Sequence, residues 1–148
     1  MTAIAHSVDI ARAPEDVFAY AIDFSRYPDW QGNVVSVRPE RDAPPAVGSR
    51  AVVTRRVGPR EVTGPEEITE LSPPTTWTVR GTGGPVTATA RGTIAPVGDP
   101  VRSRVTISLE FEGHGIGRLL VPLVVRRQAR RQLPRSLQKL KEVVEGGA

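Results

Sequence analysis

The chain has 148 residues, a length typical of one folded domain that buries its core without metal ions or disulfide bonds. It contains no cysteine, which excludes disulfide frameworks, thiolate metal sites and cysteine nucleophiles. The net charge is +4, and arginine carries almost all of the positive charge because Lys139 and Lys141 are the only lysines. The N-terminus lacks a basic region followed by an apolar run, and no apolar stretch approaches about 18 residues. We therefore expect one soluble, cytoplasmic domain over residues 1–148, without a transmembrane segment.

The N-terminal part predicts a strand and two short helices. Apolar positions alternate from Ile4 to Ile10, which is the period of a half-buried strand. Pro14 is preorganised for a first helical turn, and the two carboxylates after it suit the positive end of the helix dipole. A second turn is expected to begin at Asp23 or Ser25 and to run through Tyr27, with the next proline limiting its extent.

The middle of the chain predicts an antiparallel meander, because β-branched residues alternate with polar ones and Pro/Gly turns separate the runs. The expected strands are Val34 to Pro39, Ser49 to Val57, Glu61 to Leu71, Thr75 to Gly81, Pro85 to Ala95 and Arg102 to Glu112. Together with the first strand they give an antiparallel sheet of about seven strands.

The stretch from Gly115 to Glu145 predicts one long, bent helix. Pro134 lacks an N–H and favours a kink, and Pro122 is a second weak point. We expect two apolar stripes of this helix to be buried against the sheet. The first consists of Ile116, Leu119, Leu120, Leu123 and Val124, and the second of Leu133, Leu137, Leu140 and Val144.

Several phrases of the sequence resemble the START-like or SRPBCC superfamily, and within it the polyketide cyclase/dehydrase-type branch. The resemblance covers nearly the whole chain and is carried by Ala13–Phe18, Asp23–Trp30, Val47–Arg50 and Leu137–Lys141. It implies an α+β helix-grip fold, in which the sheet wraps a long C-terminal helix and two short helices follow the first strand. It also implies a cavity for an apolar ligand such as a lipid, polyketide, sterol or hormone-like molecule.

Three functions follow as hypotheses. The first is binding of a hydrophobic or amphipathic small molecule, lipid or polyketide-like, in the cavity between the sheet and the C-terminal helix. The second is a polyketide cyclase/dehydratase-type enzyme. The third is binding of nucleic acid or an anionic membrane by the basic helix, since eight basic residues and no acidic one lie between Gly115 and Lys141. No specific nucleic-acid motif is present, and the chain is compatible with a homodimer.

The aromatic residues supply most of the candidate ligand pocket, because aromatic rings beside a cavity stack on planar ligands. Plain core packing is the alternative for each of them. Arg126 and Arg130 lie near the second helical stripe, where one could meet an anionic ligand group or both could extend to solvent. The aromatic candidates are Tyr20, Phe24, Tyr27, Trp30 and Trp77.

The sequence identifies no certain catalytic group. His6 is in phase with the apolar residues of the first strand and should face inward, as an acid or base or as a hydrogen-bonded core residue. His114 has no partner at a metal-ligand spacing, so no metal is expected. No phosphate-binding or dinucleotide pattern is present, and we expect no cofactor. Glu66 and Glu67 should point to opposite faces of a strand, so one could enter the cavity.

Overall fold

Seven strands and a C-terminal helix dominate the computed structural model, which describes residues 3–98 and 101–146. The order of the elements confirms the predicted α+β helix-grip fold, with strand ends shifted by one or two residues. The elements are β1 (Ile4–Ile10), α1 (Pro14–Ala21), the 3-10 turn η1 (Phe24–Arg26), α2 (Tyr27–Trp30), β2 (Val34–Pro39), β3 (Arg50–Val57), β4 (Arg60–Ser72), β5 (Thr76–Gly83), β6 (Val86–Val97), β7 (Arg102–Gly113), α3 (Gly117–Leu120), the π-helical turn η2 (Val121–Val125) and α4 (Arg126–Gly146).

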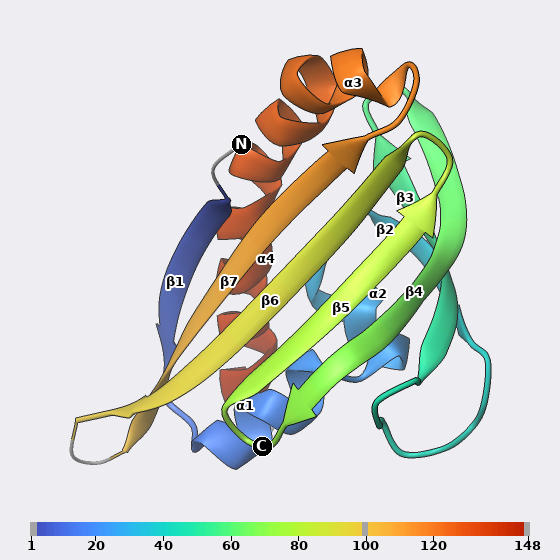
Figure 1. The fold of residues 1–148 in the computed structure, drawn as a ribbon. Coiled ribbons are helices and arrows are strands. Elements are labelled where there is room, and N and C mark those ends of the chain that lie inside the picture. The colour runs from blue at the N-terminus through green and yellow to red at the C-terminus, as the bar shows by residue number, and fades with distance from the viewer. Residues whose placement is uncertain (1–2, 99–100, 147–148) are drawn as a thin grey trace.

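The strands form one antiparallel sheet in the order β1-β7-β6-β5-β4-β3-β2. Strands β2 to β7 follow one another along the chain, whereas β1 pairs with β7 at the far edge, with Ile4 opposite Leu109. In Figure 1 the sheet lies across α4, with α1 and α2 beside its lower half and α3 at its upper end. The meander predicted from the sequence is thus confirmed, and its hairpins bring one face of every strand toward α4.

The two short helices after β1 differ from the prediction only at their ends. α1 begins at Pro14, and the Asp23 side chain caps η1 by accepting a hydrogen bond from the Ser25 amide at 3.0 Å. Pro28 was expected to limit the second helical turn, which in the structure continues past it as α2 and ends at Trp30. A proline fits the first turn of a helix, where its missing N–H has no partner to lose.

The C-terminal helix buries only the second of its two predicted stripes. Leu133, Leu137, Leu140 and Val144 are buried against the sheet, as predicted. The prediction for the first stripe was wrong: Ile116, Leu119 and Leu123 are exposed, and Leu120 and Val124 are half-buried.

The reason lies in the way α3 contacts the sheet. A Cβ on Gly117 would come within 2.0 Å of the Pro85 carbonyl oxygen, and one on Gly113 within 2.2 Å of the Gly117 oxygen. Backbone therefore packs on backbone here, and Val121 is the buried apolar residue of the segment. Pro122 lies in the π-turn, where its missing N–H breaks the regular ladder, while the helix stays α-helical through Pro134.

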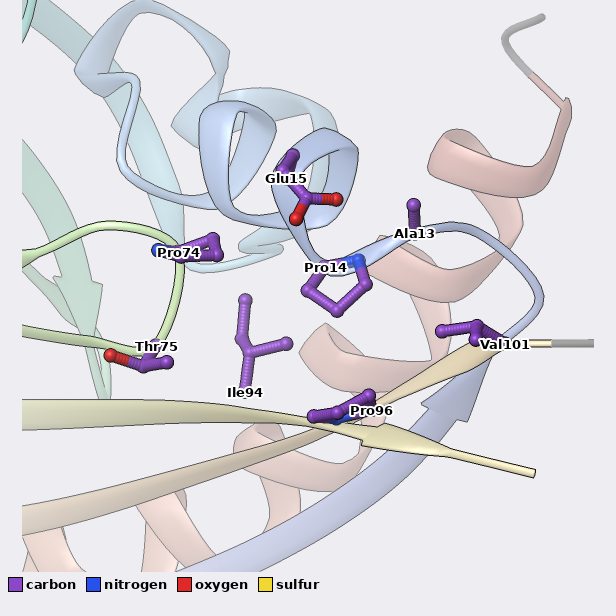
Figure 2. Close-up of a pocket in the computed structure, with 8 residues that line it drawn as sticks. All are labelled: Ala13, Pro14, Glu15, Pro74, Thr75, Ile94, Pro96 and Val101. Atoms are coloured by element: carbon purple, nitrogen blue, oxygen red, sulfur yellow. The ribbon is translucent and has the colours of Figure 1, made fainter. Parts of the chain in front are cut away.

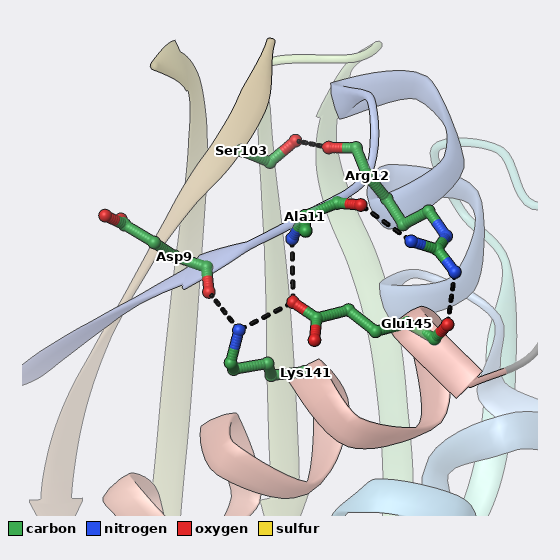
Figure 3. A network of polar contacts seen from close by, with 6 residues as sticks. All are labelled: Asp9, Ala11, Arg12, Ser103, Lys141 and Glu145. Carbon is green, nitrogen blue, oxygen red and sulfur yellow. Dashed lines mark hydrogen bonds and ion pairs between the residues drawn. The ribbon is translucent and has the colours of Figure 1, made fainter. Parts of the chain in front are cut away.

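The lower end of α4 is fastened to the end of β1 by a polar network (Figure 3). The Glu145 carboxylate accepts hydrogen bonds from the Ala11 amide at 2.8 Å and from Lys141 Nζ at 2.6 Å. Lys141 Nζ also donates to the Asp9 carbonyl at 3.1 Å, and Arg12 donates to the Glu145 carbonyl. These bonds lower the pKa of the Glu145 carboxyl, through Lys141 first and the Ala11 amide second. The helix is thereby held to β1, an edge strand of the sheet.

Candidate functional site

The helix-facing side of the sheet is closed in its lower half and partly open in its upper half. We use lower interior for the helix-facing residues Ala51, Val53, Ile68, Trp77, Val79, Gly92, Ile94, Val105 and Ile107, all of which are buried. We use upper interior for the helix-facing residues Arg55, Val62, Gly64, Glu66, Gly81, Val86, Ala88, Ala90, Leu109 and Phe111, all of which are half-buried. The same strands carry both sets. Side chains thus fill the space beneath α4 at one end and leave it partly accessible at the other.

Small residues explain the openness of the upper interior. The helix-facing residues of β6 are Ala88 and Ala90 in the upper half, whereas Ile94 faces the helix in the lower half. In the upper half β4 and β5 contribute Gly64 and Gly81. Alanine and glycine extend too little from the backbone to reach α4 across the layer. In the lower half, by contrast, the ring of Trp77 lies against Gly92, where a Cβ would come within 2.2 Å of it. The helix-facing positions are therefore less buried where the side chains are short.

A polar cluster centred on Arg55 forms the wall of the upper interior at β3 and β4. Arg55 binds Glu66 through two hydrogen bonds, Nε to Oε2 at 2.7 Å and Nη2 to Oε1 at 3.0 Å. Its Nη1 donates to Gln31 Oε1 at 2.8 Å and to Asn33 Oδ1 at 3.3 Å. The side chains of the ion pair are 26% and 13% exposed. Burial opposes the charge of Arg55, but the Glu66 carboxylate outweighs it and raises the pKa of Arg55.

Two aromatic residues predicted for the pocket adjoin this cluster. The Arg55 guanidinium lies 5.9 Å from the centre of the Tyr27 ring, and the Trp30 ring packs edge-on against Tyr27 at 6.0 Å. Burial first and the Glu66 charge second raise the pKa of Tyr27, so its phenol stays neutral at physiological pH. Trp30 Nε1 is buried without a hydrogen-bond acceptor among the described residues. An unpaired buried donor typically costs about 1–3 kcal/mol.

The other predicted aromatic residues divide between core and surface. Phe24 packs on Tyr27 at 5.1 Å, and Trp77 packs edge-on against Phe18 at 5.8 Å in the lower interior. Tyr20 is half-buried, and its hydroxyl donates to Asp29 at 2.8 Å. The Arg26 guanidinium covers the same ring at 4.7 Å.

The remaining predicted residues are His6, Arg126 and Arg130. His6 has the helix-facing register of β1, opposite Ile107, as predicted, but it is exposed, so the expectation of a core histidine was wrong. β1 is an edge strand, and its side chains are open to solvent from the side. Arg130 is exposed and extends to solvent, whereas Arg126 is half-buried. Arg126 and residues of β5, β6 and β7 line a polar pocket of about 280 Å³: Arg80, Thr87, Thr89, Glu110, Phe111 and Glu112.

A larger groove lies at the opposite end of the molecule, between α1 and the ends of β5 and β6 (Figure 2). Its volume is about 470 Å³. Its lining is mostly apolar and comes from three loops, the start of α1 and the end of β6: Ala13, Pro14, Glu15, Pro74, Thr75, Ile94, Pro96 and Val101. Glu15 is its one ionisable side chain, so this groove lacks the grouped polar contacts of the upper interior.

The described residues show no metal site and no membrane-spanning helix. Among residues 3–98 and 101–146, no group of three or more His, Asp or Glu side chains could hold a metal ion. In the same residues, no helix is both long and apolar enough to cross a bilayer.

Sequence reasoning missed Arg55, although a signal was present. Arg55 continues the alternation of Ala51 and Val53, which places it on the helix-facing side of β3. An arginine in phase with a buried face needs a partner there, and Glu66 on the same face of β4 supplies it, although the register places Val62 opposite Arg55. The prediction that Glu66 and Glu67 face opposite ways is confirmed, since Glu67 lies beside Arg50 at 3.6 Å on the other face.

The comparisons with known proteins agree with this architecture. A family model described as polyketide cyclase / dehydrase and lipid transport matches residues 1–145. The chain therefore belongs to this family, and its fold is the START-like helix-grip fold. Membership supports a ligand-binding or cyclase role in general terms. No curated protein matches the chain in the sequence comparison.

Solved structures show the same fold at low sequence identity. The protein TTHA0849 from Thermus thermophilus superposes with a TM-score of 0.80 and 20% identity, covering 99% of both chains. The Zhui aromatase/cyclase from Streptomyces sp. R1128 superposes with a TM-score of 0.78 and 15% sequence identity, covering 97% of this chain and 93% of its own. A START superfamily protein from Mycobacterium smegmatis superposes with a TM-score of 0.72 and 16% sequence identity, covering 100% of both chains.

Proposed function

We propose that the protein binds a hydrophobic or amphipathic small molecule, lipid or polyketide-like, in the upper interior. The observation that carries this proposal is the half-burial of ten helix-facing positions beside a fully buried lower interior. Small residues such as Ala88 and Ala90 supply an apolar floor, and family membership supports ligand binding in general. The ligand's apolar part lies on this floor beneath α4.

The polar cluster gives the ligand an orientation. Arg55 is held by Glu66 and by two side-chain oxygens, so its guanidinium is fixed before a ligand arrives. A ligand with a hydroxyl or carbonyl group can place it beside Tyr27 and the Trp30 donor. Two or three placed polar groups in an otherwise apolar site are the usual source of specificity in small-molecule pockets. The ligand is therefore amphipathic, with its polar end toward β3.

A filling substitution tests the proposal. Ala90→Leu places a larger side chain in the upper interior, and Ala95→Leu makes the same change on the exposed, outward-facing side of β6. Native mass spectrometry and thermal shift with fatty acids and aromatic polyketides should find a ligand that stabilises the unmodified chain and Ala95→Leu. Ala90→Leu should lose that stabilisation. Equal stabilisation of both variants would place the ligand elsewhere.

A second candidate is a cyclase or dehydratase acting on a polyketide-like substrate. The family description names polyketide cyclase / dehydrase, and the Streptomyces structure is named an aromatase/cyclase. The observation that favours it is the grouping of a neutral phenol, a guanidinium and a carboxylate at Tyr27, Arg55 and Glu66. Tyr27→Phe should then abolish turnover of an aromatic polyketide while ligand binding persists, and His6→Ala should change neither. Binding without turnover by the unmodified chain assigns the site to binding alone.

A further inference from the structure

The α3–η2 segment ends the molecule with an exposed apolar surface. Ile116, Leu119 and Leu123 are 66%, 64% and 63% exposed, and we refer to these three as the apolar tip. Their spacing of three and four residues places them on one side of the helix. In Figure 1 the segment forms the upper end of the molecule, beyond the sheet. Large apolar side chains gathered at one exposed site indicate a contact with another apolar phase.

A row of arginines continues from the apolar tip along the same side of the helix. Leu119, Leu123, Arg127 and Arg131 follow one another at intervals of four residues, and all four are exposed. We refer to Arg127, Arg130 and Arg131 as the basic ridge. Among the described residues, no ion pair involves any member of this ridge. Its positive charge is therefore open to an external anion.

The fold holds this segment in place without using the apolar tip. Gln128 accepts a hydrogen bond from the Gly58 amide at 2.7 Å and donates to the Arg56 carbonyl at 2.6 Å. On the other side, Gly117 packs on the backbone of Pro85. These contacts and the buried Val121 side chain fix the segment. The three exposed side chains contribute little to the folded chain, so folding does not explain them.

We propose that the apolar tip and the basic ridge together dock on the surface of an anionic lipid bilayer. The tip side chains enter the boundary between head groups and acyl chains, and the arginines contact lipid phosphates. Neither feature alone identifies the partner, but their continuity along one helix side does. A nucleic acid would leave the apolar tip without a role, and a second copy docked tip to tip would bring two basic ridges together. This inference is independent of the ligand in the upper interior.

Vesicle binding tests the two features separately. The full chain is mixed with phosphatidylcholine vesicles with or without phosphatidylglycerol, and the bound fraction is measured by flotation. Each basic residue near an anionic surface contributes about a fivefold factor, so Arg127→Gln with Arg131→Gln should weaken binding about 25-fold. Leu119→Ser with Leu123→Ser should weaken it at least about tenfold, through lost apolar contact.

Matched controls separate docking from overall charge and from unfolding. Arg91→Gln with Arg102→Gln removes the same two charges from exposed positions on the outward face of the sheet, and binding should change less than about threefold. Because all of the changed side chains are exposed, thermal midpoints should stay close to that of the unmodified chain.

A reporter at the apolar tip measures insertion directly. The chain has no cysteine, so Leu123→Cys and Arg91→Cys each carry a single site for an environment-sensitive fluorophore. On anionic vesicles the label at residue 123 should shift to the blue and be quenched by a quencher in the acyl chains, whereas the label at residue 91 should not. Equal spectra at both sites would overturn the proposal. So would binding only to duplex DNA, or self-association abolished by the leucine variant without any vesicle binding.

Discussion

The upper and lower interiors are built on the same strands and beneath the same helix, yet they differ in how fully their side chains are buried. The lower interior is closed by Trp77, Ile94 and the buried leucines of α4, and it is fastened by the Glu145 network. The upper interior carries alanines, glycines and an ion pair, and it is half-buried throughout. A site for a ligand costs packing that would otherwise stabilise the fold. The difference shows how one sheet separates stability from accessibility along its length.

The largest expected effect comes from opening the lower interior. Leu137 is fully buried, and Leu137→Ala should lower the free energy of unfolding by about 2–5 kcal/mol, because it removes apolar contacts and leaves a cavity. Leu119→Ala is the matched change on the exposed part of the helix and should cost less than about 0.5 kcal/mol. Urea denaturation measures both. Similar losses would mean that both helix stripes support the fold.

The second comparison adds a methyl group at one helix-facing glycine in each interior. Gly92→Ala would bring a Cβ within 2.2 Å of the rigid Trp77 ring, and it should cost about 1–3 kcal/mol or more. A Cβ on Gly81 meets the flexible Glu66 side chain at 3.1 Å, so Gly81→Ala should cost clearly less. Thermal unfolding of the two variants gives the comparison. A larger loss for Gly81→Ala would contradict the assignment of the open half.

The ion pair of the upper interior gives the third comparison. Arg55→Met leaves the Glu66 carboxylate half-buried without its main partner, and it should cost about 1–3 kcal/mol. The double variant with Glu66→Leu removes both charges and should recover part of that loss. A double-mutant cycle in urea measures the coupling. If the losses of the two single variants are additive, the ion pair positions the Arg55 side chain without adding to the free energy of unfolding.

The smallest expected effect concerns acid stability at the lower end of α4. The pKa of Glu145 is lowered in the folded chain, so its contribution is present above its usual pKa of 4.5 and is lost as pH falls through the folded value. Glu145→Gln should cost about 1 kcal/mol at neutral pH and should flatten the loss of stability below about pH 4.5. Glu142→Gln, an exposed carboxylate on the same helix, is the control. Parallel pH profiles for the two variants would rule out the role given to Glu145.

The strands and helices could be predicted from the sequence, because period-2 alternation and Pro/Gly turns determine them locally. The difference between the two interiors could not be predicted, because Ala88 and Ala90 fit a strand as well as Ile94 does. Whether a small side chain leaves space depends on its distance from α4, which the sequence does not give. The stripe at Leu119 has correct helical spacing, but its exposure depends on where the sheet ends. His6 illustrates the same limit, since periodicity gives a face and not a depth.

The pairing of the first strand with the last has a consequence for synthesis on the ribosome. The Ser7 and Thr106 hydroxyls form a hydrogen bond between β1 and β7, although the two residues are 99 positions apart in the sequence. The Ala11 amide donates a hydrogen bond to Glu145, which is 134 positions away. A nascent chain emerges from its N-terminus first, at about 5–20 residues per second. β1 must therefore wait several seconds, with its apolar side uncovered, until its partners leave the exit tunnel. This delay predicts that β1 is a natural binding site for a nascent-chain chaperone, detectable by crosslinking stalled chains that end before residue 102.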